Sequence, residues 1–120
     1  MSLVKKILIA EDELLIAKVL RMQLEKLGYE VENVVDSHQA ISNTLNFKPD
    51  MIILDVFLKN NTSGIDSAIK IRELGIRTPI IFTTGNSYDD TIELVSKVKF
   101  SMILSKPVEF DHLLQLIEDF

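Results

Sequence analysis

Four apolar residues that run directly into one carboxylate decide the fold of this chain. Residues 51–55 read Met51-Ile52-Ile53-Leu54-Asp55, between a Pro-Asp pair at 49–50 and a polar loop that begins at residue 59. A short apolar run with such flanks predicts a strand that is buried on both faces. Strands of this kind occur chiefly in parallel sheets that helices cover. Asp55 is therefore predicted at the carboxyl end of a central strand, where open α/β sheets bind ligands.

The composition is typical of one ordinary globular domain. The chain has 120 residues, 47% of them hydrophobic and 26% charged, so we predict a single domain over residues 1–120. It has no cysteine, which excludes disulfides and thiolate metal sites. No apolar run is long enough for a membrane span or a secretory signal, and we expect a cytoplasmic protein with no membrane partner. The net charge of -5 argues against direct binding of nucleic acid.

Short apolar runs alternate along the chain with segments of helical period. This alternation predicts an α/β fold: a doubly wound, five-stranded parallel sheet with five helices and right-handed crossovers. We expect strands at residues 4–10, 29–35, 51–55, 80–83 and 102–104. We expect helices at residues 13–27, 39–47, 65–75, in the segment after 87–89, and at 110–120.

Several helix ends and faces also have sequence signals. Gly28 is predicted to close the first helix, and Asp36 with Ser37 to cap the second. Ser87 or Asp89 is predicted to cap the fourth. The apolar positions with helical period are Ile16, Val19, Leu20, Leu24 and Leu27 in the first helix, Ala40, Ile41, Thr44 and Leu45 as the inward stripe of the second, and Ile92, Val95 and Val98 in the fourth.

Polar residues stand at the carboxyl ends of four of the predicted strands. Glu11 and Asp12 follow the first strand, Asp55 ends the third, Thr84 ends the fourth and Lys106 follows the fifth. In an open parallel sheet these ends lie along one edge. We therefore expect three carboxylates, one hydroxyl and one ammonium to share a pocket. The neighbouring Thr at position 83 is expected on the opposite face, because side chains alternate along a strand.

Three carboxylates in one pocket call for protons or a cation, because like charges raise each other's pKa. Mg²⁺ prefers oxygen ligands, and the predicted ligands are Glu11, Asp12, Asp55 and the backbone carbonyl of Phe57; Mn²⁺ is a second candidate. A metal held among acids beside Lys106 suits phosphoryl transfer. Because an aspartate accepts a phosphoryl group as an acyl phosphate, Asp55 is the predicted acceptor.

Four motifs in register span essentially the whole chain: residues 7–13 (ILIAEDE), 52–55 (IILD), 79–85 (PIIFTTG) and 106–107 (KP). With these motifs the chain resembles the CheY-like receiver domain of response regulators in two-component signalling. The resemblance implies a flavodoxin-like strand order of 2-1-3-4-5. It also implies a phosphorylatable switch rather than an enzyme.

The resemblance further implies roles for the residues at the strand ends. Asp55 would take a phosphoryl group from a phosphohistidine on a partner, either a sensor histidine kinase or a histidine phosphotransfer protein. Mg²⁺ would be bound by Glu11, Asp12, Asp55 and the Phe57 carbonyl. Thr84 would hydrogen-bond the phosphoryl group, and Lys106 would form a salt bridge with it. The Lys106-Pro107 bond would be cis, which proline permits.

Some positions depart from the family pattern. The first acid pair is Glu-Asp, a common variant of Asp-Asp. Position 103 holds Ile103 where many members carry an aromatic switch residue, and the loop 55–64 is one residue longer and lacks the frequent Met-Pro. The resemblance assigns switching, and a homodimer, to the face of the fourth helix, fifth strand and fifth helix. The last helix has apolar residues in excess of its core needs: Phe110, Leu116 and Phe120.

Three alternative functions are open at this stage. A phosphohydrolase with an aspartyl nucleophile usually has a second acid two residues later, where this chain has Phe57. A nucleotide or flavin module would need a glycine-rich phosphate loop, and the chain has only four Gly. A protein-interaction module that is never phosphorylated would not need the complete set of strand-end residues. His38 and His112 are predicted to face solvent on helices.

Overall fold

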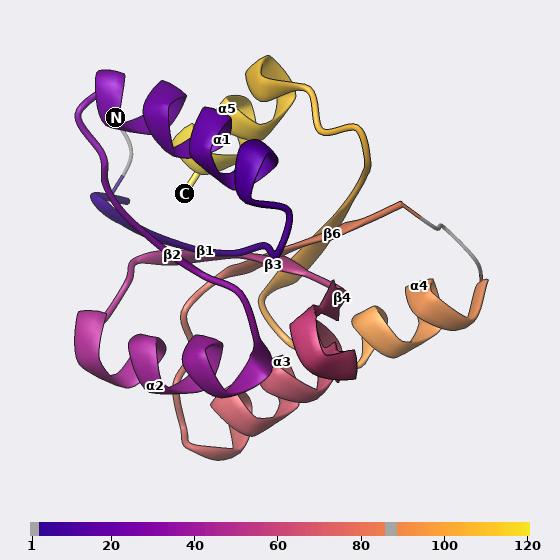
Figure 1. Cartoon of the computed structure of the whole chain (residues 1–120). Helices are drawn as coiled ribbons and strands as arrows, with labels where there is room; N and C mark the ends of the chain where they lie inside the picture. The colour runs from indigo at the N-terminus through magenta and orange to yellow at the C-terminus, as the bar shows by residue number, and fades with distance from the viewer. Residues whose placement is uncertain (1–2, 86–88) are drawn as a thin grey trace.

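Five parallel strands form the central sheet in a computed structural model that describes residues 3–85 and 89–120. Figure 1 shows how the helices lie around this sheet. The order of the strands is β2-β1-β3-β6-β7. When these five strands alone are numbered along the chain, their order is the predicted 2-1-3-4-5. The doubly wound α/β fold is confirmed. The strands are β1 (Lys6–Ala10), β2 (Glu30–Val34), β3 (Met51–Asp55), β6 (Ile80–Thr84) and β7 (Ser101–Ser105).

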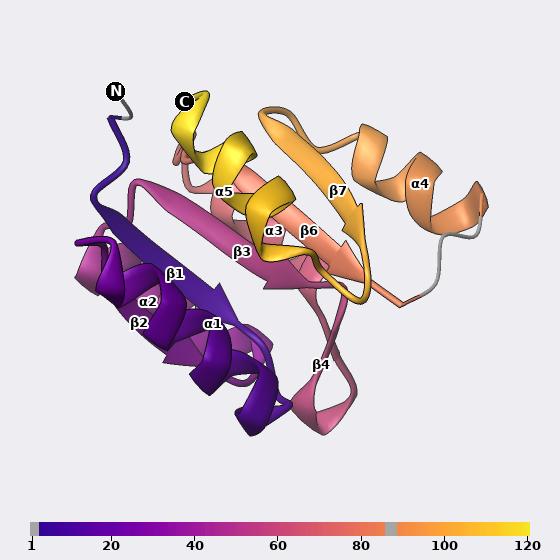
Figure 2. The ribbon, with the colours of Figure 1, turned by 90° about the horizontal axis from the view of Figure 1, so that it is seen from above.

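Helices cover both faces of the sheet, so that the molecule has three layers (Figures 1 and 2). One face carries α1 (Leu14–Lys26) and α5 (Phe110–Glu118). The other carries α2 (Ser37–Phe47), α3 (Gly64–Glu73) and α4 (Asp89–Ser96). All five predicted helices are present. Among the described helices, none has the length and apolar character that crossing a bilayer requires.

The central strand β3 is buried along its entire length, as its apolar run predicts. Alternate side chains of the strands enter two separate cores. Ile53 packs on the side of α1 and α5, together with Leu24 and Leu113. Leu54 packs on the other side, in the core beneath α2, α3 and α4. This double burial fixes β3 as the middle strand, and Asp55 therefore lies at the carboxyl end of the middle strand.

The ends of three helices can be compared with the sequence signals. The Asp36 carboxylate accepts a hydrogen bond from the Gln39 backbone N–H at 2.8 Å, which confirms the cap of α2. Gly28, with φ of 97°, follows α1 as predicted. Asp89 is itself the first residue of α4, and Ser87 lies outside the described residues.

Helix α1 buries fewer apolar side chains than its period suggests. Its buried residues are Ala17 and Leu24, whereas Ile16, Val19 and Leu27 are 44%, 49% and 54% exposed. The apolar arc of this helix is wider than the strip that meets the sheet. The predicted inward stripe of α2 is wrong at Leu45, and Ile92 of α4 is exposed as well.

The segment after β3 has more order than the predicted polar loop. It forms a small antiparallel pair, β4 (Phe57–Leu58) and β5 (Thr62–Ser63), joined by the 3-10 turn η1 (Lys59–Asn61). Asn60 and Asn61 have positive φ, a conformation that asparagine tolerates better than most residues. Hydrogen bonds from Lys59 N to Val35 O (3.0 Å) and from Ser37 N to Thr62 Oγ1 (3.1 Å) tie this pair to the connection between β2 and α2.

Candidate functional site

Three carboxylates meet at the carboxyl ends of β1 and β3. Asp55 is the last residue of β3, and Glu11 and Asp12 directly follow β1. One carboxylate oxygen from each residue lies within 4.8 Å of the others. Glu11 and Asp55 are both only 5% exposed. The structure therefore brings together the three acids that the sequence predicted at this edge.

Lys106, which directly follows β7, also contacts this cluster. Its Nζ donates to Glu11 Oε1 at 2.8 Å and to Asp55 Oδ2 at 2.6 Å. A backbone hydrogen bond helps to fix the position of this residue: Lys106 N donates to Thr84 O at 2.8 Å. The Lys106-Pro107 bond is cis, as the resemblance implied. The side chain thus links residues 95 positions apart.

Two effects of opposite sign act on the pKa of Lys106. Burial lowers it, but the hydrogen bonds to Asp55 and Glu11 and the charges of these carboxylates outweigh burial and raise it above its usual 10.5. Lys106 therefore carries its proton at neutral pH. One positive charge faces three carboxylates, so their formal charges leave the site with a surplus of negative charge.

Backbone groups fix the two most buried carboxylates. Phe57 N donates to Asp55 Oδ1 at 3.0 Å, and Glu13 N donates to Glu11 Oε2 at 3.2 Å. Phe57 is 62% exposed, and the role of its carbonyl as a metal ligand stays a prediction.

Gly64 lies close to the backbone of Asp55. Gly64 N donates to Val56 O at 2.8 Å, and a Cβ at position 64 would collide with the Asp55 carbonyl oxygen. Sequence reasoning missed Gly64, although a glycine that opens a helix is unusual enough to notice.

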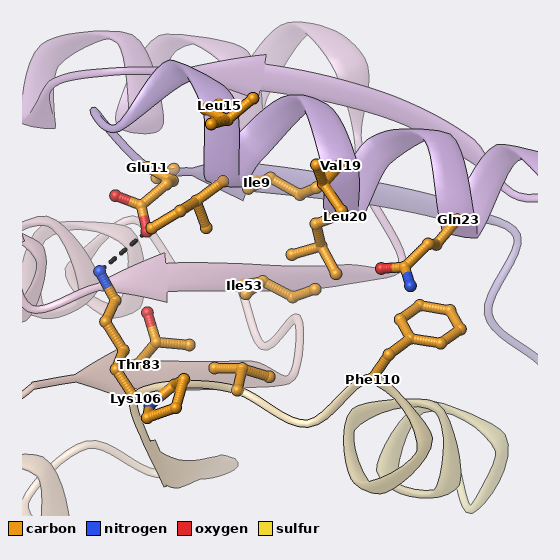
Figure 3. A pocket seen from close by; sticks show the side chains of 14 residues that line it. Ile9, Glu11, Leu15, Val19, Leu20, Gln23, Ile53, Thr83, Lys106 and Phe110 are labelled. Carbon is orange, nitrogen blue, oxygen red and sulfur yellow. Dashed lines mark hydrogen bonds and ion pairs between the residues drawn. The ribbon is translucent and has the colours of Figure 1, made fainter.

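The two threonines at the end of β6 differ from expectation. Thr83 was expected on the face away from the site, but it is the register partner of Asp55 and lines the same groove as Glu11 and Lys106 (Figure 3). The alternation of side chains along β6 did not say which of the two threonines lies beside Asp55, because that depends on the register of β6 against β3. Thr84 is the next residue, completely buried at the strand end, so two hydroxyls are candidates for contact with a bound group.

An apolar groove of about 600 Å³ leads away from the Lys106 ammonium between α1 and α5. Figure 3 shows Leu15, Val19 and Leu20 of α1 on one side and Phe110 of α5 on the other. The charged site is therefore bordered by exposed apolar surface on the α1 side.

These observations agree with the comparisons with known proteins. The chain matches the response regulator receiver domain family over residues 7–118. It belongs to this family. The receiver domain is 32% identical over 114 residues to the transcriptional regulatory protein DltR of Streptococcus agalactiae serotype III, covering 93% of this chain and 50% of that protein. It is 34% identical over 115 residues to the transcriptional regulatory protein PdtaR of Mycobacterium tuberculosis, covering 95% and 55%. The chain thus spans about half the length of the curated relatives it matches.

One similar solved structure is the receiver domain of the sensor histidine kinase PA1611 from Pseudomonas aeruginosa PAO1, with a magnesium ion coordinated in its active site cleft. It is 29% identical, with a TM-score of 0.84, and the match covers 97% of this chain and 96% of that one. His38 and His112 of the present chain, numbered as in the printed sequence, are exposed, as predicted.

Proposed function

We propose that this receiver domain is a switch in which Asp55 accepts a phosphoryl group from a phosphohistidine on a partner histidine kinase or histidine phosphotransfer protein. The observation that supports it most is the meeting of Asp55, Glu11 and Asp12 with the Lys106 ammonium at one edge of the sheet. A phosphoryl group carries negative charge, and it needs both a nucleophile and positive charge at one place. The cytoplasmic location stays a prediction.

The three acids suit a magnesium ion. Their carboxylates are hard oxygen donors of the kind that Mg²⁺ prefers, and one oxygen of each lies within 4.8 Å of the others. We infer that Glu11, Asp12, Asp55 and the Phe57 carbonyl hold Mg²⁺, with Mn²⁺ as a substitute. The magnesium ion in the PA1611 receiver domain supports this assignment. When bound, the ion would neutralise charge on the incoming phosphoryl oxygens.

The chemistry of the transfer falls to residues of this chain. An Asp55 carboxylate oxygen forms a bond to phosphorus as the phosphorus–nitrogen bond of the phosphohistidine breaks, and the electron pair of that bond stays on the imidazole nitrogen. Lys106, already 2.6 Å from Asp55 Oδ2, turns to pair with the phosphoryl oxygens. Thr84 donates a hydrogen bond to the same group. Because the charge on Asp55 is then carried by the phosphoryl group, the contacts of β6 and β7 around the site change.

A phosphoryl donor must approach the edge of the sheet where Asp55 lies, and apolar surface flanks that approach. Leu14 and Leu15 are 67% and 74% exposed at the start of α1, and Phe57 stands exposed beyond Asp55. The face of α4, β7 and α5 is our proposed output face, with a homodimer as one form of output. Ile103 in β7 is half-buried, so the aromatic switch of many relatives has no counterpart at this position.

A small donor with a phosphorus–nitrogen bond tests the proposal without the partner. The receiver domain is incubated with phosphoramidate and Mg²⁺, and its intact mass is measured over time. We expect one phosphoryl group on the wild type and none on Asp55→Asn. Asp119→Asn removes a carboxylate from the exposed end of the chain and is the matched control, which should label like the wild type.

Labelling of Asp55→Asn at the rate of the wild type would refute the assignment of the acceptor. Release of many equivalents of phosphate per protein would instead support the phosphohydrolase. No labelling with phosphoramidate or with acetyl phosphate, with Mg²⁺ present, would support an interaction module that is never phosphorylated.

A further inference from the structure

A basic hollow lies beside the amino-terminal ends of β6 and β7, at the opposite end of the strands from Asp55. It is formed by the connection from α3 to β6 and the connection from α4 to β7, and its volume is about 460 Å³. Both connections precede strands, whereas the acid site follows strands. Figure 2 shows β6 and β7 running from the end of the molecule where the C-terminus lies. We call this place the distal basic hollow, and its charged lining residues are Arg72, Arg77, Lys97 and Lys99.

Arg72 builds the hollow by joining the two connections. Its guanidinium donates to Ile76 O (3.0 Å) and Thr78 O (2.8 Å) in one connection, and to Lys99 O (2.8 Å) in the other. These acceptors are neutral carbonyls, so the positive charge of Arg72 remains uncompensated. The same contacts hold both connections, with their exposed cations, in a fixed arrangement.

Phe100 is the least expected residue of the hollow. Its φ is 56°, a left-handed conformation that is a genuine outlier for a bulky side chain. Its ring is nevertheless 48% exposed and contacts two cations: the guanidinium carbons of Arg77 and Arg72 lie 4.9 Å and 5.8 Å from its centroid. An exposed aromatic ring beside two guanidinium groups, on a backbone in a left-handed conformation, adds little to the core. It presents a flat apolar surface beside positive charge.

The charge of the hollow contrasts with that of the rest of the chain. Its four cations form no ion pair with any carboxylate among residues 3–85 and 91–120, whose side chains the structure describes. The chain has 13 Lys and Arg against 18 Asp and Glu, so outside the hollow nine cations face twice as many acids. Positive charge is thus concentrated at one edge of an acidic molecule.

We propose that the distal basic hollow docks a short acidic segment of a partner protein that also carries apolar side chains. The carboxylates would pair with Arg77, Lys97 and Lys99, and the apolar side chains would cover Phe100 and Ile76. Charge complementarity favours a short segment over a nucleic acid, because a long polyanion would extend onto the surrounding acidic surface and be repelled. The inference goes beyond phosphorylation, because it uses none of the residues of the acid site.

A labelled peptide tests the proposal. The probe is a fluorescein-labelled 12-residue peptide of alternating Glu and Leu, and its binding to the whole chain is followed by fluorescence anisotropy at low and at physiological salt. We expect saturable binding that weakens as salt rises. The double variant Arg77→Glu/Lys99→Glu should bind about tenfold more weakly or worse, and Phe100→Gly, which suits the positive φ, should also lose affinity.

The matched control is Lys18→Glu/Lys26→Glu, which makes the same change of net charge at two exposed positions of α1. It should bind the peptide like the wild type, and circular dichroism should show that all variants are folded. Equal loss of affinity in both double variants would overturn the proposal, as would no saturable binding at low salt. Tighter binding of a single-stranded oligonucleotide of equal charge, lost in Arg77→Glu/Lys99→Glu, would assign the hollow to nucleic acid and overturn it too.

Discussion

Lys106 is the residue on which the charge balance of the site depends. Its ammonium forms ion pairs with both Glu11 and Asp55, and it offsets part of their mutual repulsion. Its side chain is 22% exposed, so water screens these contacts only in part. A neutral side chain at this position would leave the acids without a permanent cation.

The raised pKa of Lys106 has a consequence for stability at alkaline pH. A group whose pKa is higher in the folded than in the unfolded state stabilises the fold fully below the unfolded value and loses this effect as pH rises through the folded value. Without Mg²⁺, we expect Lys106→Met to be less stable than the wild type at neutral pH by about 1–3 kcal/mol. This difference should shrink only above pH 10.5, the usual pKa of lysine.

Urea unfolding of both proteins in EDTA, from neutral to strongly alkaline pH, measures this difference. Subtracting the variant removes contributions from other groups that titrate in the same range, such as Tyr29, whose pKa is raised by burial and then by the charge of Glu118. A difference that already disappears between pH 7 and pH 9 would contradict the raised pKa.

Gly64 determines how closely α3 approaches the end of β3. Because a Cβ at this position would collide with the Asp55 carbonyl oxygen, we expect Gly64→Ala to destabilise the protein by about 1–3 kcal/mol. Gly85→Ala is the matched control, since a Cβ there meets no atom within 4 Å. Thermal unfolding of both variants measures the effect. A Gly64→Ala variant as stable as Gly85→Ala would show that the backbone relaxes freely around Asp55.

At the scale of single elements, the sequence predicted where strands and helices occur better than which faces they bury. Strand β3 was recognised because five consecutive buried residues leave no periodicity to misread. Helix α1 was harder, because it is apolar over a wide arc and only contact with the sheet decides which part is buried. The β4–β5 pair was missed, since two-residue strands depend on tertiary hydrogen bonds such as Lys59 N to Val35 O.

Helix α1 offers a direct test of which side chains stabilise the fold. Leu24 is completely buried, whereas Val19 of the same helix is 49% exposed. We expect Leu24→Ala to cost about 2–5 kcal/mol of unfolding free energy, and Val19→Ala to change stability by about 0.5 kcal/mol or less. Chemical denaturation of the two variants measures both values. Similar losses for both would mean that the apolar face of α1 is covered in solution.

The candidate site was predictable to the extent that strand ends of a parallel sheet share one edge. This rule placed Glu11, Asp12, Asp55 and Lys106 together without coordinates. It favoured Thr84 over Thr83, whereas the register of β6 against β3 places Thr83 beside Asp55. The distal basic hollow was not predicted either, since its cations come from two connections that have no shared motif.

On the whole molecule, negative and positive charge gather at opposite ends of the strands of one sheet. Carboxylates gather where strands end, and cations gather where β6 and β7 begin. We propose that the acid edge tolerates its surplus negative charge because it binds a divalent cation, and that the same edge accepts a phosphoryl group.

Calorimetric titration of Mg²⁺ into the receiver domain measures this binding of a divalent cation. We expect one Mg²⁺ per chain, bound at least about tenfold more weakly by Asp12→Asn and by Asp55→Asn, with Asp119→Asn unchanged as the control. Binding to Asp12→Asn and Asp55→Asn with the affinity of the wild type, or no binding of Mg²⁺ at millimolar concentration, would contradict this proposal.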